Sequence, residues 1–309
     1  MPPALGGAVA AIGNFDGLHR GHRAVIARAK ALAQERGAPA VVLTFEPHPS
    51  DFFAKRSAVF RLTPQRDKAQ AIEALGLDGV VVLSFDSRLA HMSADAFVAD
   101  VLVGQLGVSG VVVGYDFHFG AQRAGSPDFL RAAGARRGFS VDIVERIAAD
   151  DDGALESVSS TATRAALEVG DMDRAAALLG RPWRVSGVVT HGRKLGRTLG
   201  YPTANLALDP SCRLRRGVYA VRARVDGVWR AGVANFGSRP MFDDGPPLLE
   251  AHLFDFSGDL YGREMAVEMI AFLRDEAKFD TIDALVAQMD ADSRAARAAF
   301  AVEKGRPRA

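Results

Sequence analysis

Short apolar runs alternate with amphipathic stretches over the first half of the chain. The apolar runs cover residues 8–12, 40–45, 80–85, 111–115 and 141–144, and helical patterns between them cover 19–36, 64–76, 93–107 and 126–137. This alternation is typical of a parallel sheet with helices on both faces. In such sheets ligands bind beyond the carboxyl ends of the strands, and the first run ends at Gly13. We therefore expect an α/β unit whose site lies near that glycine.

The pattern changes after Pro182. Two short helical patterns, 162–168 and 172–179, precede it, and one long helical pattern at 282–300 closes the chain. Between them, β-rich runs cover 184–190, 218–225, 228–236, 248–256 and 265–272. The dipeptide Asp226-Gly227 is a strong hairpin signal. We expect a small antiparallel β-barrel with one C-terminal helix, and a boundary that separates 1–182 from 183–309.

Composition narrows the class of protein. The chain has 309 residues, about twice a typical domain, and 24% of them are charged. Its net charge of +1 gives no reason to expect nucleic acid or an anionic membrane as a partner. Cys212 is the single cysteine, so no internal disulfide forms. Residues 1–7 lack the basic region of a signal peptide, and no apolar stretch reaches the ~18–20 residues that span a bilayer. We expect a soluble, cytoplasmic protein.

The most informative segment is 12–22, Ile-Gly-Asn-Phe-Asp-Gly-Leu-His-Arg-Gly-His. His19 and His22 are three residues apart at the start of a predicted helix, so they share a face. Free backbone N–H groups and the helix dipole favour an anion there. Glycines stand where backbone must approach a ligand closely, at Gly13, Gly17 and Gly21. The segment predicts a phosphate site; the alternative is a capped helix with two surface histidines. Zinc is disfavoured, since the helical metalloprotease pattern needs histidines four apart.

Two further segments of the first half are candidates for a site. Residues 113–120 follow a predicted strand and combine glycines with aromatic residues, so Phe117 and Phe119 could line a ring-binding pocket or belong to the core. Asp116 is the expected polar contact. Residues 159–161, Ser-Ser-Thr, precede a helix that contains Arg164. They could cap that helix or grip phosphates with it.

The second half has one phosphate-type segment and one candidate base. Residues 191–205 combine glycines and basic residues, then continue as an extended strand in which Thr203 and Asn205 point the same way. Such oxygens suit Mg²⁺, whereas the alternative is a basic surface turn. Glu250 and His252 share one face of a strand. Glu250 would be either an acid that points into the barrel or an exposed charge.

These motifs resemble, in order and over nearly the whole chain, those of the bacterial bifunctional riboflavin kinase/FAD synthetase family. The matching segments are Gly-Asn-Phe-Asp-Gly-x-His-x-Gly-His, Gly-x-Asp-Phe-x-Phe-Gly, Ser-Ser-Thr-x-x-Arg, Gly-x-Pro-Thr-Ala-Asn and Glu-x-His-Leu-x-Asp-Phe. The resemblance implies a Rossmann-like nucleotidyltransferase sheet followed by a riboflavin kinase barrel. It implies that the enzyme phosphorylates riboflavin with ATP and then adenylylates FMN to FAD, releasing pyrophosphate.

The resemblance also implies residue roles. His19 and His22 would stabilise charge on the triphosphate, Glu250 would be the kinase base, and Thr203 with Asn205 would hold Mg²⁺. Nucleotide contacts would come from Gly13, Asn14, Phe15, Asp16, Gly17, Ser159, Ser160, Thr161, Arg164, Gly192, Lys194, Gly196, Arg197 and Gly200. Flavin contacts would come from Asp116, Phe117, Phe119, Asn235, Arg274 and Phe279. The chain departs from the family pattern at Thr163, Arg193, Tyr201 and Met241.

Two rival functions are also compatible with this sequence. One is a different adenylyl- or cytidylyltransferase with an accessory barrel, which the long form of the 14–22 segment disfavours. The other is a barrel that stores flavin without turnover, which Glu250 and the Pro-Thr-Ala-Asn segment disfavour. We expect riboflavin, FMN and ATP as small-molecule substrates, and a monomer or weak homo-oligomer.

Overall fold

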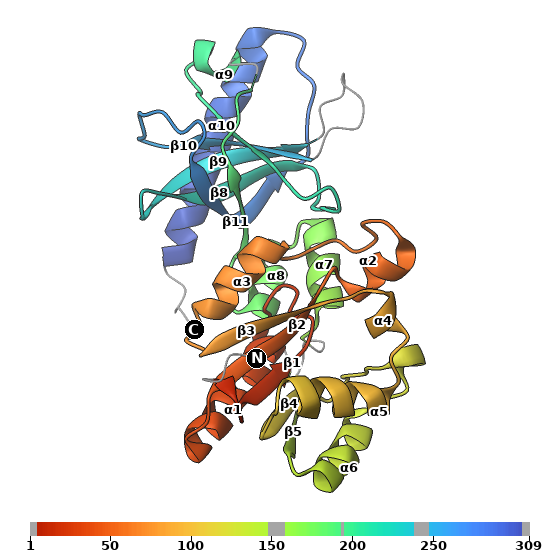
Figure 1. Cartoon of the computed structure of the whole chain (residues 1–309). Helices are drawn as coiled ribbons and strands as arrows, with labels where there is room; N and C mark the ends of the chain where they lie inside the picture. Colours follow the sequence, from red (N-terminus) through yellow and green to blue (C-terminus); the bar gives the residue numbers. More distant parts are fainter. Residues whose placement is uncertain (1–4, 148–157, 193–194, 238–246, 305–309) are drawn as a thin grey trace. The chain divides into compact units, whose positions relative to one another are not determined.

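The structure is a computed structural model, and it describes residues 5–147, 158–192, 195–237 and 247–304. Close contacts divide the chain into two compact units. Unit 1 comprises Met1–Val59 and Thr63–Ser160, and unit 2 comprises Phe60–Leu62 and Thr161–Ala309. Each unit has its own sheet and its own hydrophobic core (Figure 1).

Unit 1 is built on a five-stranded parallel sheet in the order β3-β2-β1-β4-β5. Its strands are β1 (Val9–Ile12), β2 (Ala40–Glu46), β3 (Gly79–Ser84), β4 (Gly110–Gly114) and β5 (Ser140–Val144). Its helices are α1 (Arg20–Arg36), α2 (Pro49–Ala54), α3 (Gln65–Glu73), α4 (Ser87–Ala90), α5 (Ala94–Ala96), the π-helical η2 (Phe97–Gln105), the 3-10 turn η3 (Ala121–Arg123) and α6 (Pro127–Arg137). The predicted parallel sheet is confirmed. Strand order reverses between β1 and β4, which is where ligands bind in such sheets.

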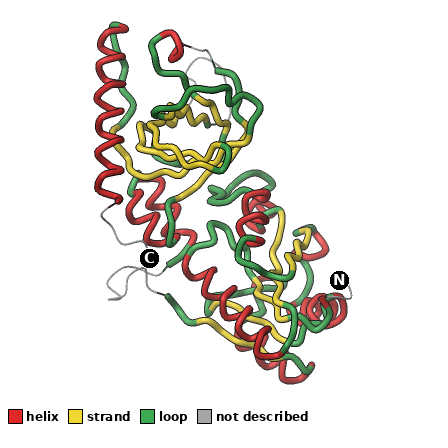
Figure 2. Tube along the Cα trace, turned by 90° about the vertical axis from the view of Figure 1, so that its left-hand side faces the viewer, coloured by secondary structure: helices red, strands yellow, loops and turns green. Residues whose placement is uncertain are grey.

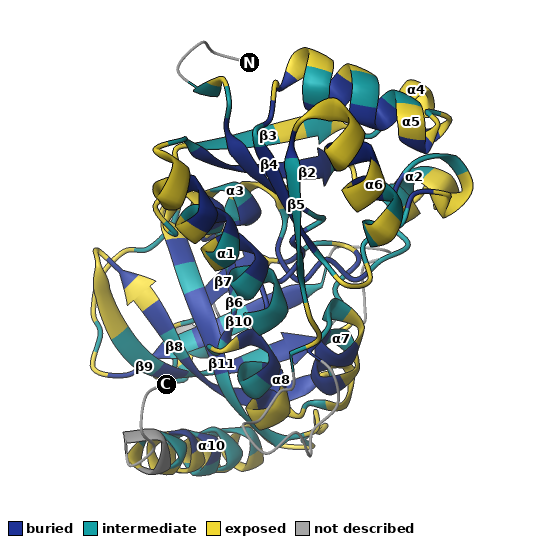
Figure 3. Cartoon of the chain, turned by 90° about the horizontal axis from the view of Figure 1, so that it is seen from below, coloured by how far each residue is buried: buried dark blue, intermediate teal, exposed yellow. Residues whose placement is uncertain are grey.

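Helices cover both faces of this sheet, as the alternation predicts. On one face, Ala11 shares a hydrophobic cluster with Ile26 of α1 and Ile72 of α3. On the other face, Ala10 shares a cluster with Leu130 of α6. The central strands β1, β2 and β4 are buried along nearly their whole length, whereas the edge strand β5 is only partly buried (Figure 3). Burial on both faces explains why these strands are continuous apolar runs.

The apolar pattern does not predict α2 and α4. The first begins with Pro49 and is capped by His48, whose Nδ1 accepts a hydrogen bond from the Ser50 N–H at 3.2 Å. The second is capped by the Asp86 carboxylate. Helices of six and four residues are too short to show a helical period, so their caps are the only sequence signal.

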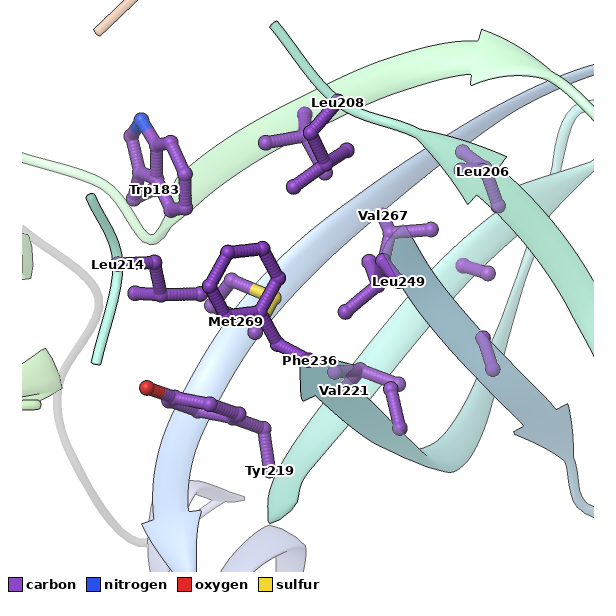
Figure 4. Packing of buried hydrophobic residues seen from close by; sticks show 14 of the residues in the cluster. Trp183, Leu206, Leu208, Leu214, Tyr219, Val221, Phe236, Leu249, Val267 and Met269 are labelled. Carbon is purple, nitrogen blue, oxygen red and sulfur yellow. The ribbon is translucent and has the colours of Figure 1, made fainter. Parts of the chain in front are cut away.

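Unit 2 contains a six-stranded antiparallel sheet in the order β6-β11-β8-β9-β10-β7. The strands are β6 (Trp183–Val188), β7 (Ala204–Ala207), β8 (Gly217–Val225), β9 (Val228–Gly237), β10 (Leu248–Leu253) and β11 (Glu264–Arg274). A bridge between Thr190 and Asn205 links the chain after β6 to β7, so the sheet nearly closes into the predicted barrel (Figure 2). Trp183, Leu206, Tyr219 and Leu249 belong to one cluster of buried side chains that lies between its strands (Figure 4).

Turn residues decide two details of the barrel. Asp226 and Gly227 both have positive φ, 52° and 80°, and they connect β8 to β9 as the predicted hairpin. The strand predicted at 248–256 ends earlier, because β10 stops at Leu253 and Asp255 takes a left-handed φ of 54°.

Unit 2 contains α7 (Ser160–Val169) except for its first residue, and also α8 (Met172–Leu179), α9 (Leu195–Thr198) and α10 (Ile282–Lys304). Helices α7 and α8 supply Leu167, Met172 and Leu179 to the same cluster as the barrel interior. Helix α10 runs along the outer face of the barrel, where Ala296 packs with Phe254 (Figure 1). The predicted C-terminal helix is therefore confirmed.

Candidate active sites

The paired histidines lie directly after β1. The His19 side chain caps α1, and its Nδ1 accepts a hydrogen bond from the His22 N–H at 3.2 Å. The two imidazole rings stack with centroids 3.5 Å apart and planes 17° apart. The structure thus brings both rings together at a helix N-terminus, beside backbone N–H groups that favour an anion.

Two glycines of this segment make room for the segment's own rings. A Cβ added at Gly13 would lie 3.2 Å from the Phe15 ring, and one at Gly21 would lie 3.2 Å from the His19 ring. Phe15 is 1% exposed and meets His22 edge-on, with ring centroids 5.3 Å apart. Gly21 therefore leaves room for the stacked His19 ring, and Gly13 leaves room for the Phe15 ring, which the sequence alone does not reveal.

Asp16 stabilises the turn between β1 and α1 through two hydrogen bonds. Its buried carboxylate Oδ1 accepts a hydrogen bond from the Thr63 N–H at 2.9 Å. Its backbone carbonyl accepts a hydrogen bond from the Ser160 hydroxyl at 2.9 Å. Ser160, and Ser159 before it, therefore belong with the histidine segment in unit 1. Thr161 and Arg164 belong to unit 2, where the Arg164 Nε donates to the carbonyl of Phe60 at 2.7 Å.

Lys68 of α3 is a buried charge that the sequence analysis missed. It is 2% exposed, and its Nζ lies 2.5 Å from Oε1 of Glu46 at the end of β2. The same Nζ lies 3.3 Å from the Asn14 carbonyl and 3.3 Å from the Thr44 hydroxyl. The sequence contains one indication that Lys68 is buried. Lys68 is four residues before the buried Ile72, so the two side chains share a face of the helix.

The aromatic segment after β4 is divided between core and surface. Phe119 is 7% exposed and lies in the core, with ring centroids 5.3 Å from Phe97 and 6.0 Å from Phe129. Phe117 stacks on Phe119 at 5.5 Å and is partly exposed, whereas Asp116 is exposed. Of the three candidate flavin contacts, Asp116 and Phe117 are thus the accessible ones.

In unit 2, strand pairing places Glu250 of β10 between two asparagines. Glu250 is paired with Asn205 of β7 and with Asn235 of β9. Residues paired across antiparallel strands point to the same face. The neighbours Leu249 and Ala251 belong to the barrel core, so Glu250 faces away from it. Of the two alternatives left open for Glu250, the one in which it points into the barrel core does not hold; alternation along the strand fixes two faces without showing which one is inside.

The side-chain oxygen of Asn205 is buried and can still accept a ligand. The residue is 2% exposed, and among the described residues its Oδ1 has no hydrogen-bond partner. A Cβ at Gly192 would lie 2.6 Å from the Asn205 amide nitrogen, so the glycine-rich segment covers this side chain. A buried carbonyl-type oxygen without a partner is costly unless a cation or ligand satisfies it. Asn205 therefore fits a Mg²⁺ ligand, with Thr203 two residues before it.

The glycine-rich segment turns through α9 before it reaches β7. The Tyr201 N–H donates to the Gly196 carbonyl at 2.7 Å, and Gly200 has a left-handed φ of 84°. The backbone of Tyr201 leaves no space for a Cβ at Gly196. Lys194, the side chain of Arg197, and the departures at Arg193 and Met241 lie outside the described residues.

The remaining flavin candidates of unit 2 surround the end of β11. Two nitrogens of Arg274, Nε and Nη2, donate to the carboxylate of Asp292 on α10 at 2.8 and 2.7 Å. The Phe279 ring centre is 5.9 Å from the guanidinium carbon of Arg274. Asn235 Nδ2 donates to Oε1 of Glu276 at 3.3 Å. Arg274 and Phe279 are thus brought together, while the Arg274 guanidinium is already engaged by α10.

Comparison with known proteins assigns both halves of the chain. A family model described as FAD synthetase matches residues 1–162, and one described as riboflavin kinase matches residues 179–300. The bifunctional riboflavin kinase/FMN adenylyltransferase of Pseudomonas fluorescens is 46% identical to this chain. The match covers 96% of this chain and 94% of the length of that protein. The chain belongs to the bifunctional riboflavin kinase/FMN adenylyltransferase family. The bifunctional riboflavin kinase/FMN adenylyltransferase of Haemophilus influenzae is 41% identical, and the match covers 96% of this chain and 95% of the length of that protein. A crystal structure of a Streptococcus pneumoniae protein described as a macrolide-efflux protein has a TM-score of 0.84 and 30% identity, and it covers 96% of this chain and 95% of that one.

The two matched segments of this family separate the two candidate sites. The FAD synthetase segment contains His19 and His22, and the riboflavin kinase segment contains Asn205 and Glu250. Within the described parts of the chain, no helix is long and apolar enough to cross a membrane. In those same parts no three His, Cys, Asp or Glu side chains gather as a metal site.

Proposed function

We propose that this chain makes FAD from riboflavin in two steps, with phosphorylation in unit 2 and adenylyl transfer in unit 1. The observation that carries the proposal is that each half matches its own family model and contains its own cluster of candidate residues. Riboflavin, FMN and ATP are the small-molecule substrates of these activities.

In the kinase step, Glu250 takes the proton from the 5′-hydroxyl of riboflavin. The hydroxyl oxygen forms a bond to the γ-phosphorus of ATP, the bond from that phosphorus to the bridging oxygen breaks, and ADP leaves. Thr203 and Asn205 would hold Mg²⁺, which supplies charge neutralisation at the phosphate oxygens when bound. The buried Oδ1 of Asn205, which has no hydrogen-bond partner in the described parts of the chain, supports that role, as does the position of Asn205 opposite Glu250.

The rest of the kinase site divides between nucleotide and flavin. Phosphates would lie under the glycine-rich segment, with contacts from Gly192, Lys194, Gly196, Arg197 and Gly200. The flavin ring would contact Asn235, Arg274 and Phe279. Because Asp292 holds the Arg274 guanidinium in a bidentate pair, we assign Arg274 to the wall of the site rather than to a mobile contact.

In the adenylyl transfer step, a phosphate oxygen of FMN attacks the α-phosphorus of a second ATP. A new P–O–P link forms, the bond to the β-phosphate breaks, and pyrophosphate leaves. His19 and His22 stabilise the charge that develops on the leaving group, and positioning supplies the rest. Nucleotide contacts would come from Gly13, Asn14, Phe15, Asp16, Gly17, Ser159, Ser160, Thr161 and Arg164. Flavin contacts would come from Asp116 and Phe117, with Phe119 behind them in the core.

A time course with purified protein tests this function. Riboflavin, ATP and Mg²⁺ are supplied, and the flavins are separated by chromatography. We expect FMN to form first and FAD to follow. Formation of FMN alone, or binding of riboflavin without turnover, would contradict the two-step proposal.

Three further proposals concern the domain boundary, the oligomeric state and the location of the protein. We propose a domain boundary after Pro182, a monomer or weak homo-oligomer without nucleic-acid partners, and a cytoplasmic location that fits the single cysteine, Cys212. Size-exclusion chromatography with light scattering tests the oligomeric state.

A further inference from the structure

A buried ion pair lies beneath the turn that carries the histidines of unit 1. Lys68 and Glu46 are 2.5 Å apart, and their side chains are 3% and 9% exposed. The Lys68 ammonium also reaches the Phe45 carbonyl at 3.4 Å and the Thr44 hydroxyl at 3.3 Å. Lys68 thus lies against the carboxyl end of β2, next to β1, where the histidine segment begins.

The Lys68 ammonium also donates a hydrogen bond to the histidine segment itself. The Asn14 carbonyl accepts hydrogen bonds from the Lys68 Nζ at 3.3 Å and from the Thr44 hydroxyl at 3.1 Å. Asn14 is the first residue after Gly13, so these two bonds fix the turn where it leaves β1. Lys68 is therefore a link between the end of β2 and the start of the turn that leads to His19.

The turn needs such a link because its backbone is strained. Phe15 and Leu18 take left-handed φ values of 51° and 46°, which bulky side chains rarely adopt. Strained residues persist only where their surroundings fix them, at a cost of roughly 1–3 kcal/mol each. Both precede His19, whose imidazole must stay stacked on His22.

We propose that Lys68, balanced by Glu46, is a positioning residue of the adenylyl transfer site. It holds the Asn14 carbonyl so that the turn sets His19 and His22 against the phosphates of ATP. This inference rests on the proposed function of unit 1. A purely structural role would be met as well by an apolar side chain, because replacing a buried ion pair with hydrophobic residues is often neutral for stability. An apolar residue would not bind Asn14.

The test replaces both charges together as Lys68→Met/Glu46→Gln, so that neither charge is left buried alone. FAD formation from supplied FMN reports on unit 1, and FMN formation from riboflavin reports on unit 2 in the same preparation. We expect kcat for FAD formation to fall about 10–100-fold with KM for ATP nearly unchanged, since a misplacement of about 1 Å can cost a hundredfold in rate. We expect the kinase rate to stay at the wild-type level. Lys68→Arg, which keeps the charge, should recover part of the lost kcat.

Ile72→Ala is the matched control for a loss of stability. Ile72 is fully buried on the same helix, one turn after Lys68, and its truncation destabilises unit 1 without removing a bond to the turn. The proposal is supported if this control keeps its kcat after correction for unfolded protein while the double variant loses it. Thr44→Val removes the hydroxyl that bonds both the Asn14 carbonyl and the Lys68 ammonium, so it loosens the same link and gives the same test if the double variant does not fold.

Three results would overturn the proposal. The first is wild-type kcat for FAD formation in the double variant. The second is a loss in the Ile72→Ala control as large as that in the double variant. The third is a folded Thr44→Val variant with wild-type kcat beside an unfolded double variant. Wild-type protein that forms FMN but no FAD would refute the proposed function of unit 1 itself, which keeps the two failures distinct.

Discussion

Glu250→Gln separates the kinase step from everything else the chain does. The amide has nearly the same size as the carboxylate, and it keeps its place between Asn205 and Asn235 on the neighbouring strands. Glu250 is only partly buried and faces away from the barrel core, so the substitution leaves no cavity. The amide cannot take the proton from the riboflavin hydroxyl.

The expected loss follows from that missing proton transfer. Removal of a general base costs about 10²–10⁴ in rate, which corresponds to about 2.7–5.4 kcal/mol in the activation free energy. The free energy of unfolding should change by much less, within about 0.5 kcal/mol, since no core contact is lost. Riboflavin and ATP should still bind, because ground-state contacts remain.

The assay measures three quantities on one preparation. They are the rate of FMN formation from riboflavin, the rate of FAD formation from supplied FMN, and riboflavin binding by flavin fluorescence. We expect the first to collapse while the other two stay near their wild-type values. A variant that phosphorylates riboflavin at a near-normal rate would show that Glu250 is not the base.

Three further predictions test other parts of the account. His22→Ala should lower FAD formation about 10²–10³-fold and leave FMN formation unchanged, so FMN accumulates on chromatography; equal loss of both products would show that the sites are not separable. The fragment 183–309 should fold and phosphorylate riboflavin on its own, whereas 161–309 should unfold at a higher temperature, because it adds buried side chains of α7 and α8 that contribute about 1.5–3 kcal/mol each. An insoluble or inactive 183–309 fragment beside an active 161–309 fragment would show that the boundary after Pro182 is wrong. Burial raises the pKa of the Cys212 thiol from 9.0 to about 12, so at pH 8 the folded protein should hold about a thousandfold less thiolate than the unfolded chain and react far more slowly with a disulfide reagent. The thiol of the unfolded chain ionises first, so the contribution of Cys212 to stability is present below pH 9 and falls as the pH rises toward 12. Fast labelling of the native protein would contradict the raised pKa.

The sequence predicts the architecture well where one physical force decides it. Strands β1, β2 and β4 are buried on both faces, so their apolar runs have a single interpretation. The hairpin at Asp226 and Gly227 follows from backbone conformations that few residues tolerate. The short helices α2 and α4 escape prediction because capping, rather than an apolar stripe, determines them.

The candidate sites are predictable as motifs but not as arrangements. Spacing indicates that His19 and His22 meet, yet it does not show that Gly21 makes room for the His19 ring. Alternation pairs Glu250 with a polar face, but only the closed sheet shows that this face is the outer one. Lys68 and Asp292 act through partners on other elements, Asn14 and Arg274, so no local pattern shows what they bind.

The central claim is that two separate ATP-dependent reactions occur in sequence on one chain, and phosphate labelling tests it most directly. The protein is given riboflavin with ATP labelled either at the γ-phosphate or at the α-phosphate, and the label in FMN and FAD is measured. We predict that FMN takes label only from the γ-phosphate, whereas FAD takes label from both positions. FMN labelled from the α-phosphate, or FAD without label from the γ-phosphate, would contradict the account.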